Sequence, residues 1–64
     1  MRINLISARK EKNLTQKQTA KKINICERQY QKLEAGTSDG SIKIWEQLKD
    51  LFGLTIDSLL EQVE

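Results

Sequence analysis

Four long polar side chains stand close together in the middle of the chain, at Arg28, Gln29, Gln31 and Lys32. Arginine can donate two hydrogen bonds to O6 and N7 of a guanine, which is worth about 1–3 kcal/mol of discrimination between bases. Lysine can reach a guanine or a phosphate, and glutamine can pair with an adenine or bind a phosphate. The residue types therefore predict recognition of double-stranded DNA at this stretch.

A helical periodicity decides on which side these groups stand. With about 100° between successive residues, Tyr30 and Leu33 share one face of a helix over residues 27–35. Arg28 and Lys32 then lie almost opposite Tyr30, and the two glutamines flank them. The pattern predicts a helix of little more than two turns that buries its aromatic residue and points its cations away from the core.

Glu27 begins this helix and has two interpretations. In the first helical turn its carboxylate stabilises the positive end of the helix dipole. The same carboxylate can accept a hydrogen bond from the amino group of a cytosine. We keep Glu27 among the candidate DNA-binding residues, with the dipole role as the alternative.

Three short phrases share one order of residue types: a turn-former, an apolar residue and a residue at a helix-capping position. They are Asn13-Leu14-Thr15, Asn24-Ile25-Cys26 and Gly53-Leu54-Thr55. Asparagine and glycine accept the left-handed conformation that closes many helices, and Thr15 with Gln18 predicts a capping box. We expect the middle residue of each phrase to pack inward. The first two phrases are close enough for a helix-turn-helix.

Five helices follow from these junctions and from the spacing of apolar residues, at about 2–12, 16–23, 27–35, 41–52 and from 56 onward. The segment 41–52 has the strongest pattern, with apolar residues at i, i+1, i+4, i+7 and i+8 counted from Ile44. No stretch shows the alternation of a strand, and the chain has no proline. The predicted fold class is all-α, as one domain over residues 1–64.

Length and charge limit the class of protein further. A chain of 64 residues is marginally stable as a single domain and gains from a partner. Residues 1–40 carry nine Lys/Arg and four Asp/Glu, a balance of +5, while residues 41–64 carry two and five, a balance of −3. The basic part predicts a polyanionic partner on that side, with an unevenly charged solvated surface as the alternative.

The sequence offers little for catalysis, cofactor binding or membrane insertion. It has no histidine and a single cysteine, and it lacks both a glycine-rich phosphate loop and an apolar run of about 18 residues. We therefore predict a protein that is not an enzyme and that binds no cofactor, metal, small-molecule ligand or membrane. The absence of a signal-peptide pattern and the lone cysteine predict a cytoplasmic location.

Taken in order, these features resemble the Cro/C1-type helix-turn-helix regulators of phages and bacteria, also called the xenobiotic-response-element type. The resemblance covers about residues 5–60. The chain departs from the family pattern at Asn13, Thr19, Asn24 and Cys26, and it has no proline after Gly36. The matching residues are Arg9, Leu14, Thr15, Gln16, Ala20, Ile23, Asn24, Ile25, Tyr30, Leu33, Glu34, Gly36, the run 51–57, Leu59 and Leu60.

The resemblance implies a compact five-helix, lambda-repressor-like domain in which the helix over residues 27–35 enters the major groove of DNA. It also implies that Arg9 and Glu34 form a partly buried ion pair between the first and third helices. The preceding helix would lie against the sugar-phosphate backbone, where contacts fix the register of the protein. The candidates for contact with the backbone are Gln16, Lys17, Thr37 and Ser38, the last two through their amides.

Members of this family often dimerise near the C-terminus. We therefore predict a homodimer contact at Leu59, Leu60 and Val63, in addition to their use in the core. The predicted function is a sequence-specific transcriptional regulator, a repressor that binds a palindromic operator as a dimer. An antitoxin and a restriction–modification controller are alternatives with the same DNA-binding mode. A protein-interaction module on the same fold is the alternative from another class.

Overall fold

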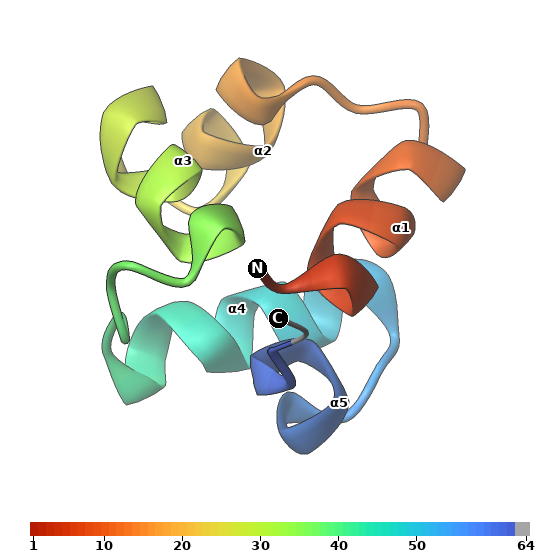
Figure 1. Ribbon diagram of the computed structural model, residues 1–64. Helices are drawn as coiled ribbons and strands as arrows, with labels where there is room; N and C mark the ends of the chain where they lie inside the picture. The colour runs from red at the N-terminus through yellow and green to blue at the C-terminus, as the bar shows by residue number, and fades with distance from the viewer. Residues whose placement is uncertain (63–64) are drawn as a thin grey trace.

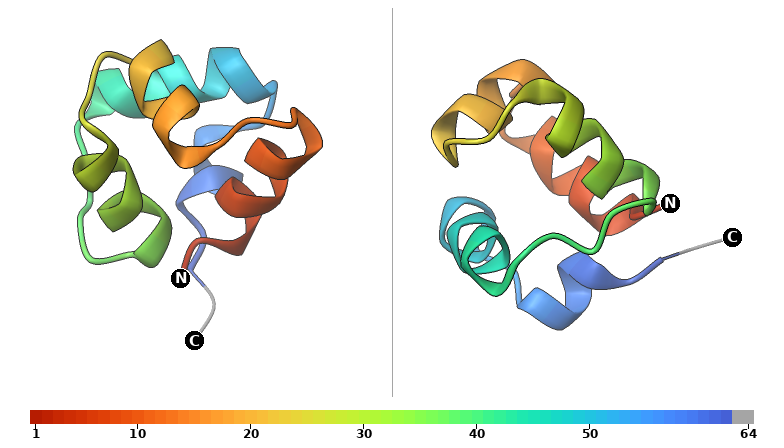
Figure 2. Two further views of the ribbon diagram at one scale, coloured as in Figure 1. Left: turned by 90° about the horizontal axis from the view of Figure 1, so that it is seen from above. Right: turned by 90° about the vertical axis from the view of Figure 1, so that its left-hand side faces the viewer.

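The computed structural model describes residues 1–62. Its helices lie in two layers, with α1, α2 and α3 on one side and α4 and α5 on the other (Figures 1 and 2). No strand occurs within the described residues, so the predicted all-α fold class is confirmed. The five helices are α1 (Ile3–Glu11), α2 (Gln16–Lys22), α3 (Glu27–Ala35), α4 (Ile42–Phe52) and α5 (Ile56–Leu60).

The three predicted helix junctions adopt the backbone conformation that their residue types favour. Asn13, Asn24 and Gly53 have φ angles of 56°, 60° and 68°, all in the left-handed region. The hydroxyls of Thr15 and Thr55 then accept hydrogen bonds from the first turns of α2 and α5. One sequence pattern therefore ends three helices and starts the next ones within three residues.

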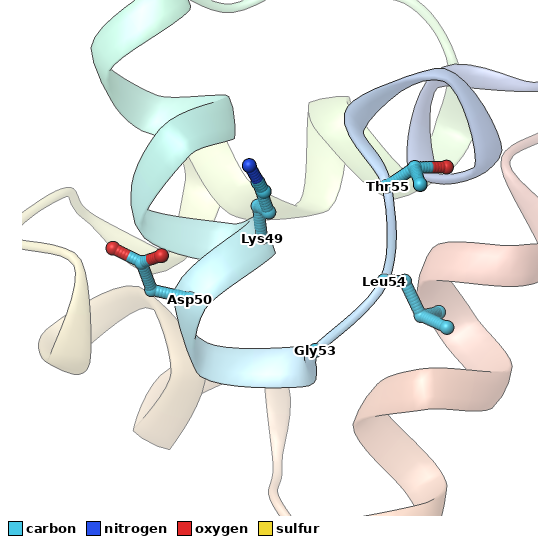
Figure 3. A pocket seen from close by; sticks show the side chains of 5 residues that line it. All are labelled: Lys49, Asp50, Gly53, Leu54 and Thr55. Carbon is cyan, nitrogen blue, oxygen red and sulfur yellow. The ribbon is translucent and has the colours of Figure 1, made fainter.

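The prediction that the middle residue of each phrase packs inward is correct for two of the three. Leu14 and Ile25 are partly buried against the core, but Leu54 remains 37% exposed. Figure 3 shows Leu54 extending from the α4–α5 loop toward α1. It borders a shallow surface hollow lined by α1 and α5, because Phe52 and Leu59 already fill the core beside this junction.

The core is built from one apolar side of each helix. On α4 the buried residues recur at helical spacing, at Trp45, Leu48 and Phe52, which places them on one stripe that faces the other layer. The remaining buried hydrophobic residues are Leu5, Ala8, Ala20, Ile23, Tyr30, Leu33 and Leu59.

Arg2 is the residue of the core that the sequence did not reveal. It is only 2% exposed, and its guanidinium stands 5.0 Å from the centre of the Trp45 ring. Its Nη1 donates hydrogen bonds of 2.7 Å to the carbonyl oxygens of both Leu33 and Ser38. Its Nε donates to the carbonyl of Leu60 at 3.3 Å. A single cation therefore joins the end of α3, the α3–α4 loop and the end of α5.

Candidate nucleic-acid interface

The pair α2 and α3 has the architecture of a helix-turn-helix. α2 ends at Lys22, α3 begins at Glu27, and the two helices pack against each other. Ala20 in α2 and Ile23 at the end of α2 are buried, as is Tyr30 in α3. The short turn therefore fixes α3 relative to α2, and α2 is too short to be stable without this packing.

The outer surface of α3 carries the polar side chains that the sequence pointed to. Tyr30, Leu33 and Glu34 are buried, which turns the opposite side of the helix to solvent. We call this exposed surface the reading face, and the exposed side chains on it are Glu27, Arg28, Gln29, Gln31 and Lys32. The structure thus brings the predicted base-contacting residues together on one accessible side of one helix.

The first turn of α3 is capped differently from the first turn of α2. In α2, Gln18 N donates to Thr15 Oγ1 at 3.0 Å, and Thr15 N donates to Gln18 Oε1 at 2.9 Å. In α3, Cys26 occupies the N-cap position, and its backbone N–H donates to Gln29 Oε1 at 3.3 Å. Because sulfur is a weak acceptor, the Gln29 carboxamide makes the stronger half of this cap. Glu27 adds a negative charge at the same end.

A buried carboxylate connects α1, α2 and α3. Glu34 Oε2 accepts a hydrogen bond of 2.7 Å from Arg9 Nε, and the two side chains are 5% and 13% exposed. Arg9 Nη1 also donates to the carbonyl of Leu14 at 2.8 Å. Gln16 Nε2 donates to Glu34 Oε1 at 2.9 Å. The carboxamide of Gln16 is therefore held in one orientation, with one N–H still available to a phosphate.

Tyr30 stands in the middle of this arrangement and is fully buried. Its hydroxyl has no hydrogen-bond partner among residues 1–62. Burial raises the pKa of the Tyr30 phenol far above its usual value, and the nearby Glu34 carboxylate raises this pKa further. The phenol therefore stays neutral further into alkaline pH than an exposed tyrosine does, and its ring is a packing group beneath the reading face.

The predicted contacts to the DNA backbone differ in their availability. Lys17 is exposed on α2, and Gln16 is half-buried. The Thr37 amide already donates to the carbonyl of Lys32 at 3.1 Å, so the proposed phosphate contact through this amide is corrected. Ser38 is half-buried, and its carbonyl is held by Arg2.

The predicted dimer contact needs one correction as well. Leu59 has no exposed surface, because its side chain closes the core of its own domain. Leu60 is half-buried and keeps some surface for a partner. Val63 lies outside the described residues.

The uneven charge of the sequence has a spatial counterpart. Exposed cations stand on α2 and α3, at Lys17, Lys21, Lys22, Arg28 and Lys32. Exposed acids stand on the other layer and at its end, at Glu46, Asp50, Asp57 and Glu61, and the exposed Lys43 and Lys49 of α4 offset two of them. The last two lysines of α2 were missed as candidates, although the basic last turn of that helix was visible in the sequence.

The described residues contain neither a metal-binding cluster nor a membrane-spanning helix. No group of three or more His, Cys, Asp or Glu side chains there could hold a metal ion. Among the same residues, no helix has both the length and the apolar character that crossing a bilayer requires.

Comparison with known proteins agrees with this geometry. A family model described as helix-turn-helix matches residues 5–59, which include all of α2, α3 and α4 and most of α1 and α5. Neither the curated proteins nor the solved structures gave a match. The matched range includes the whole α2–α3 pair and the reading face. The chain therefore belongs to the Cro/C1-type helix-turn-helix family, and it is a DNA-binding regulator of that type.

Proposed function

We propose that this protein is a sequence-specific transcriptional repressor that binds a palindromic operator as a homodimer. The observation that carries the proposal is the orientation of α3, which buries Tyr30 and exposes Arg28 and Lys32 on the opposite side. In a helix-turn-helix, the second helix lies in the major groove and its N-terminal residues contact base edges. Arg28 is the second residue of α3, so it is the first candidate for a contact with guanine.

The neighbouring polar groups have supporting roles in this proposal. Lys32 stands one turn beyond Arg28 and reaches a guanine or a phosphate, and Gln31 contacts the groove wall beside it. Gln16 and Lys17 at the start of α2 contact phosphates and set the register. The Ser38 amide remains a candidate for a further phosphate contact, whereas the Thr37 amide is already used.

Dimerisation follows from the small size of the reading face. A nine-residue α3 reads one half-site, and two half-sites on one side of DNA stand about 34–36 Å apart. We place the contact between subunits near Leu60 and the residues that follow it. The operator is then an inverted repeat, and the site of action is the cytoplasm, where the DNA lies.

The proposal is tested by selecting binding sites from random double-stranded DNA with three proteins. The wild type should enrich an inverted repeat, and Arg28→Ala should lose preference for one base pair in each half-site. Lys49→Ala is the matched control, because it removes an exposed cation from α4 and should leave the selected sequence unchanged. A wild type that enriches no sequence would reject the proposal in favour of a protein-interaction module. An Arg28→Ala variant with an unchanged preference would reject the contact of Arg28 with a base.

A further inference from the structure

A second basic surface lies on α2, outside the reading face. Its centre is a shallow hollow lined by Leu14, Gln18, Lys21 and Lys22, which we call the α2 hollow. Among the described residues, none from α3 lines it. Figure 1 shows α3 on one side of α2 and the α1–α2 loop, which carries Leu14, on the other. The α2 hollow is therefore a surface separate from the one that we assign to DNA bases.

The lining of the α2 hollow combines positive charge with an apolar side chain. Lys21 and Lys22 are exposed, and Leu14 is only partly buried against the core. Neither lysine takes part in a salt bridge within residues 1–62. The Gln18 oxygen accepts the Thr15 N–H, and the carboxamide nitrogen of Gln18 can donate to a ligand. The hollow thus presents two uncompensated ammonium groups and an amide donor around an accessible leucine.

The structural roles of these lysines explain only part of this arrangement. Both stand in the last turn of α2, where a cation stabilises the negative end of the helix dipole. However, α2 carries three lysines and no acid, and like charges four positions apart, as at Lys17 and Lys21, are unfavourable in a helix. A carboxylate from another molecule would offset this repulsion. The helix dipole also gives no reason for an apolar residue beside the two cations.

We infer that the α2 hollow binds an acidic segment of a protein partner, with carboxylates at Lys21 and Lys22 and an apolar side chain against Leu14. The charge of the hollow is complementary to such a segment. A DNA backbone offers the same negative charge but no apolar side chain to cover the leucine. This inference goes beyond the proposed function, because it gives the protein a second partner on a different surface.

The test uses a synthetic peptide in which one leucine stands between two stretches of glutamate, added to the isotope-labelled full-length protein. The NMR shift changes should centre on the residues of the α2 hollow. The double variant Lys21→Gln/Lys22→Gln should bind the peptide at least about threefold more weakly, because each exposed ion pair contributes modestly. The matched control is Lys43→Gln/Lys49→Gln, which removes two exposed cations from α4 and should bind the peptide as the wild type does.

A second peptide, with serine in place of leucine, tests the apolar contact. It should bind the wild type more weakly than the first peptide, because it leaves Leu14 uncovered. Equal affinity for the two peptides would show attraction by charge alone and would overturn the inference. Shift changes centred on the reading face, or an equal loss of affinity in the two double variants, would overturn it as well.

Measurements with DNA separate this inference from a phosphate contact and from the proposed function. On the selected operator, Lys21→Gln/Lys22→Gln should keep the wild-type slope of log affinity against log salt. A slope reduced by about 2 would make both lysines phosphate contacts and would overturn the inference. A wild type that selects no DNA sequence would reject the proposed function, whereas peptide binding at the α2 hollow would still support this inference.

Discussion

The two layers of the molecule use their residues in opposite ways. In α4 the buried residues form one continuous apolar stripe at Trp45, Leu48 and Phe52, and the layer has exposed acids on its outside. In the α2–α3 pair the outside is basic and polar, and the anchoring is done by a buried charge, Glu34. The difference teaches that the α4–α5 layer combines its apolar stripe with hydrogen bonds that end on backbone carbonyls, at Ser58 and Leu60, whereas the position of α3 depends also on a buried ion pair.

Arg2 connects the two layers, together with the bond from Asn4 of α1 to the carbonyl of Ser58 in α5. The Arg2 guanidinium binds carbonyls at the end of α3 and at the end of α5, where the negative ends of both helix dipoles lie. Within its last turn α5 has no basic residue of its own. The orientation of α3 is therefore fixed from below by Arg2 and from the side by the Glu34 network.

The largest loss of stability is expected from a variant that removes Glu34, the carboxylate that anchors α3. Glu34→Ala leaves Arg9 partly buried without its carboxylate and releases Gln16, which we expect to cost about 3–5 kcal/mol of unfolding free energy. Urea denaturation followed by circular dichroism measures this change. Glu46→Ala, which removes an exposed acid from α4, is the control and should change stability by less than about 0.5 kcal/mol. Equal effects of the two variants would show that α3 is not anchored in this way.

The next effect concerns the connection between the layers. Arg2→Met keeps the length of the side chain but removes the bonds to the carbonyls of Leu33, Ser38 and Leu60, so we expect a loss of about 2–3 kcal/mol. Thermal unfolding measures it, with Lys10→Met on the exposed side of α1 as the control. If Arg2→Met is as stable as the control, the guanidinium is not what joins the two layers.

A smaller loss of stability is expected at alkaline pH, and it comes from Tyr30 of α3. Because the pKa of Tyr30 is raised in the folded protein, the unfolded chain releases this proton first, near pH 10. The stability from the neutral phenol is thus complete below about pH 10 and decreases above it, by about 1.4 kcal/mol for each pH unit. Urea midpoints of the wild type and Tyr30→Phe between pH 9 and 11 isolate this contribution, because the lysines titrate in both proteins. Parallel curves would contradict the assignment.

The smallest effect sharpens the distinction between phosphate and base contacts within the α2–α3 pair. Lys17→Ala should weaken binding to all DNA sequences about equally and reduce the slope of log affinity against log salt by about 1. Titrations at several salt concentrations, on the selected operator and on a scrambled duplex, measure both quantities. A change in sequence preference without a change in slope would place Lys17 at a base instead.

The helix junctions and the reading face could be predicted from the sequence because they depend on local residue types. Asn13, Asn24 and Gly53 mark their junctions through the left-handed conformation that these residues tolerate. The period of α3 separates Tyr30 from Arg28 before any tertiary contact is known.

The burial of Arg2 and the exposure of Leu54 could not be predicted from the sequence. For Arg2 the reason is that its hydrogen-bond partners are backbone carbonyls, which no residue type marks. Arg2 binds backbone carbonyls that lie 31 and 58 residues away in the sequence, and a carbonyl looks the same at every position. An arginine is also mostly exposed in proteins, so its type gave no warning. The apolar type of Leu54 and Leu59 predicts burial for both, but only the packing of α5 on α1 and α4 decides that one of them remains exposed.

The most direct test of the central claim is the ratio of affinities for the selected operator and a scrambled duplex, measured for the wild type and Arg28→Ala at one salt concentration. Contacts of the α3 cations with bases predict that this ratio falls by about 5- to 150-fold in the variant, which corresponds to about 1–3 kcal/mol for each lost base contact. The melting temperature should stay unchanged, because Arg28 is exposed. A ratio that stays the same while both affinities fall together would contradict the claim, since Arg28 would then bind a phosphate and not a base.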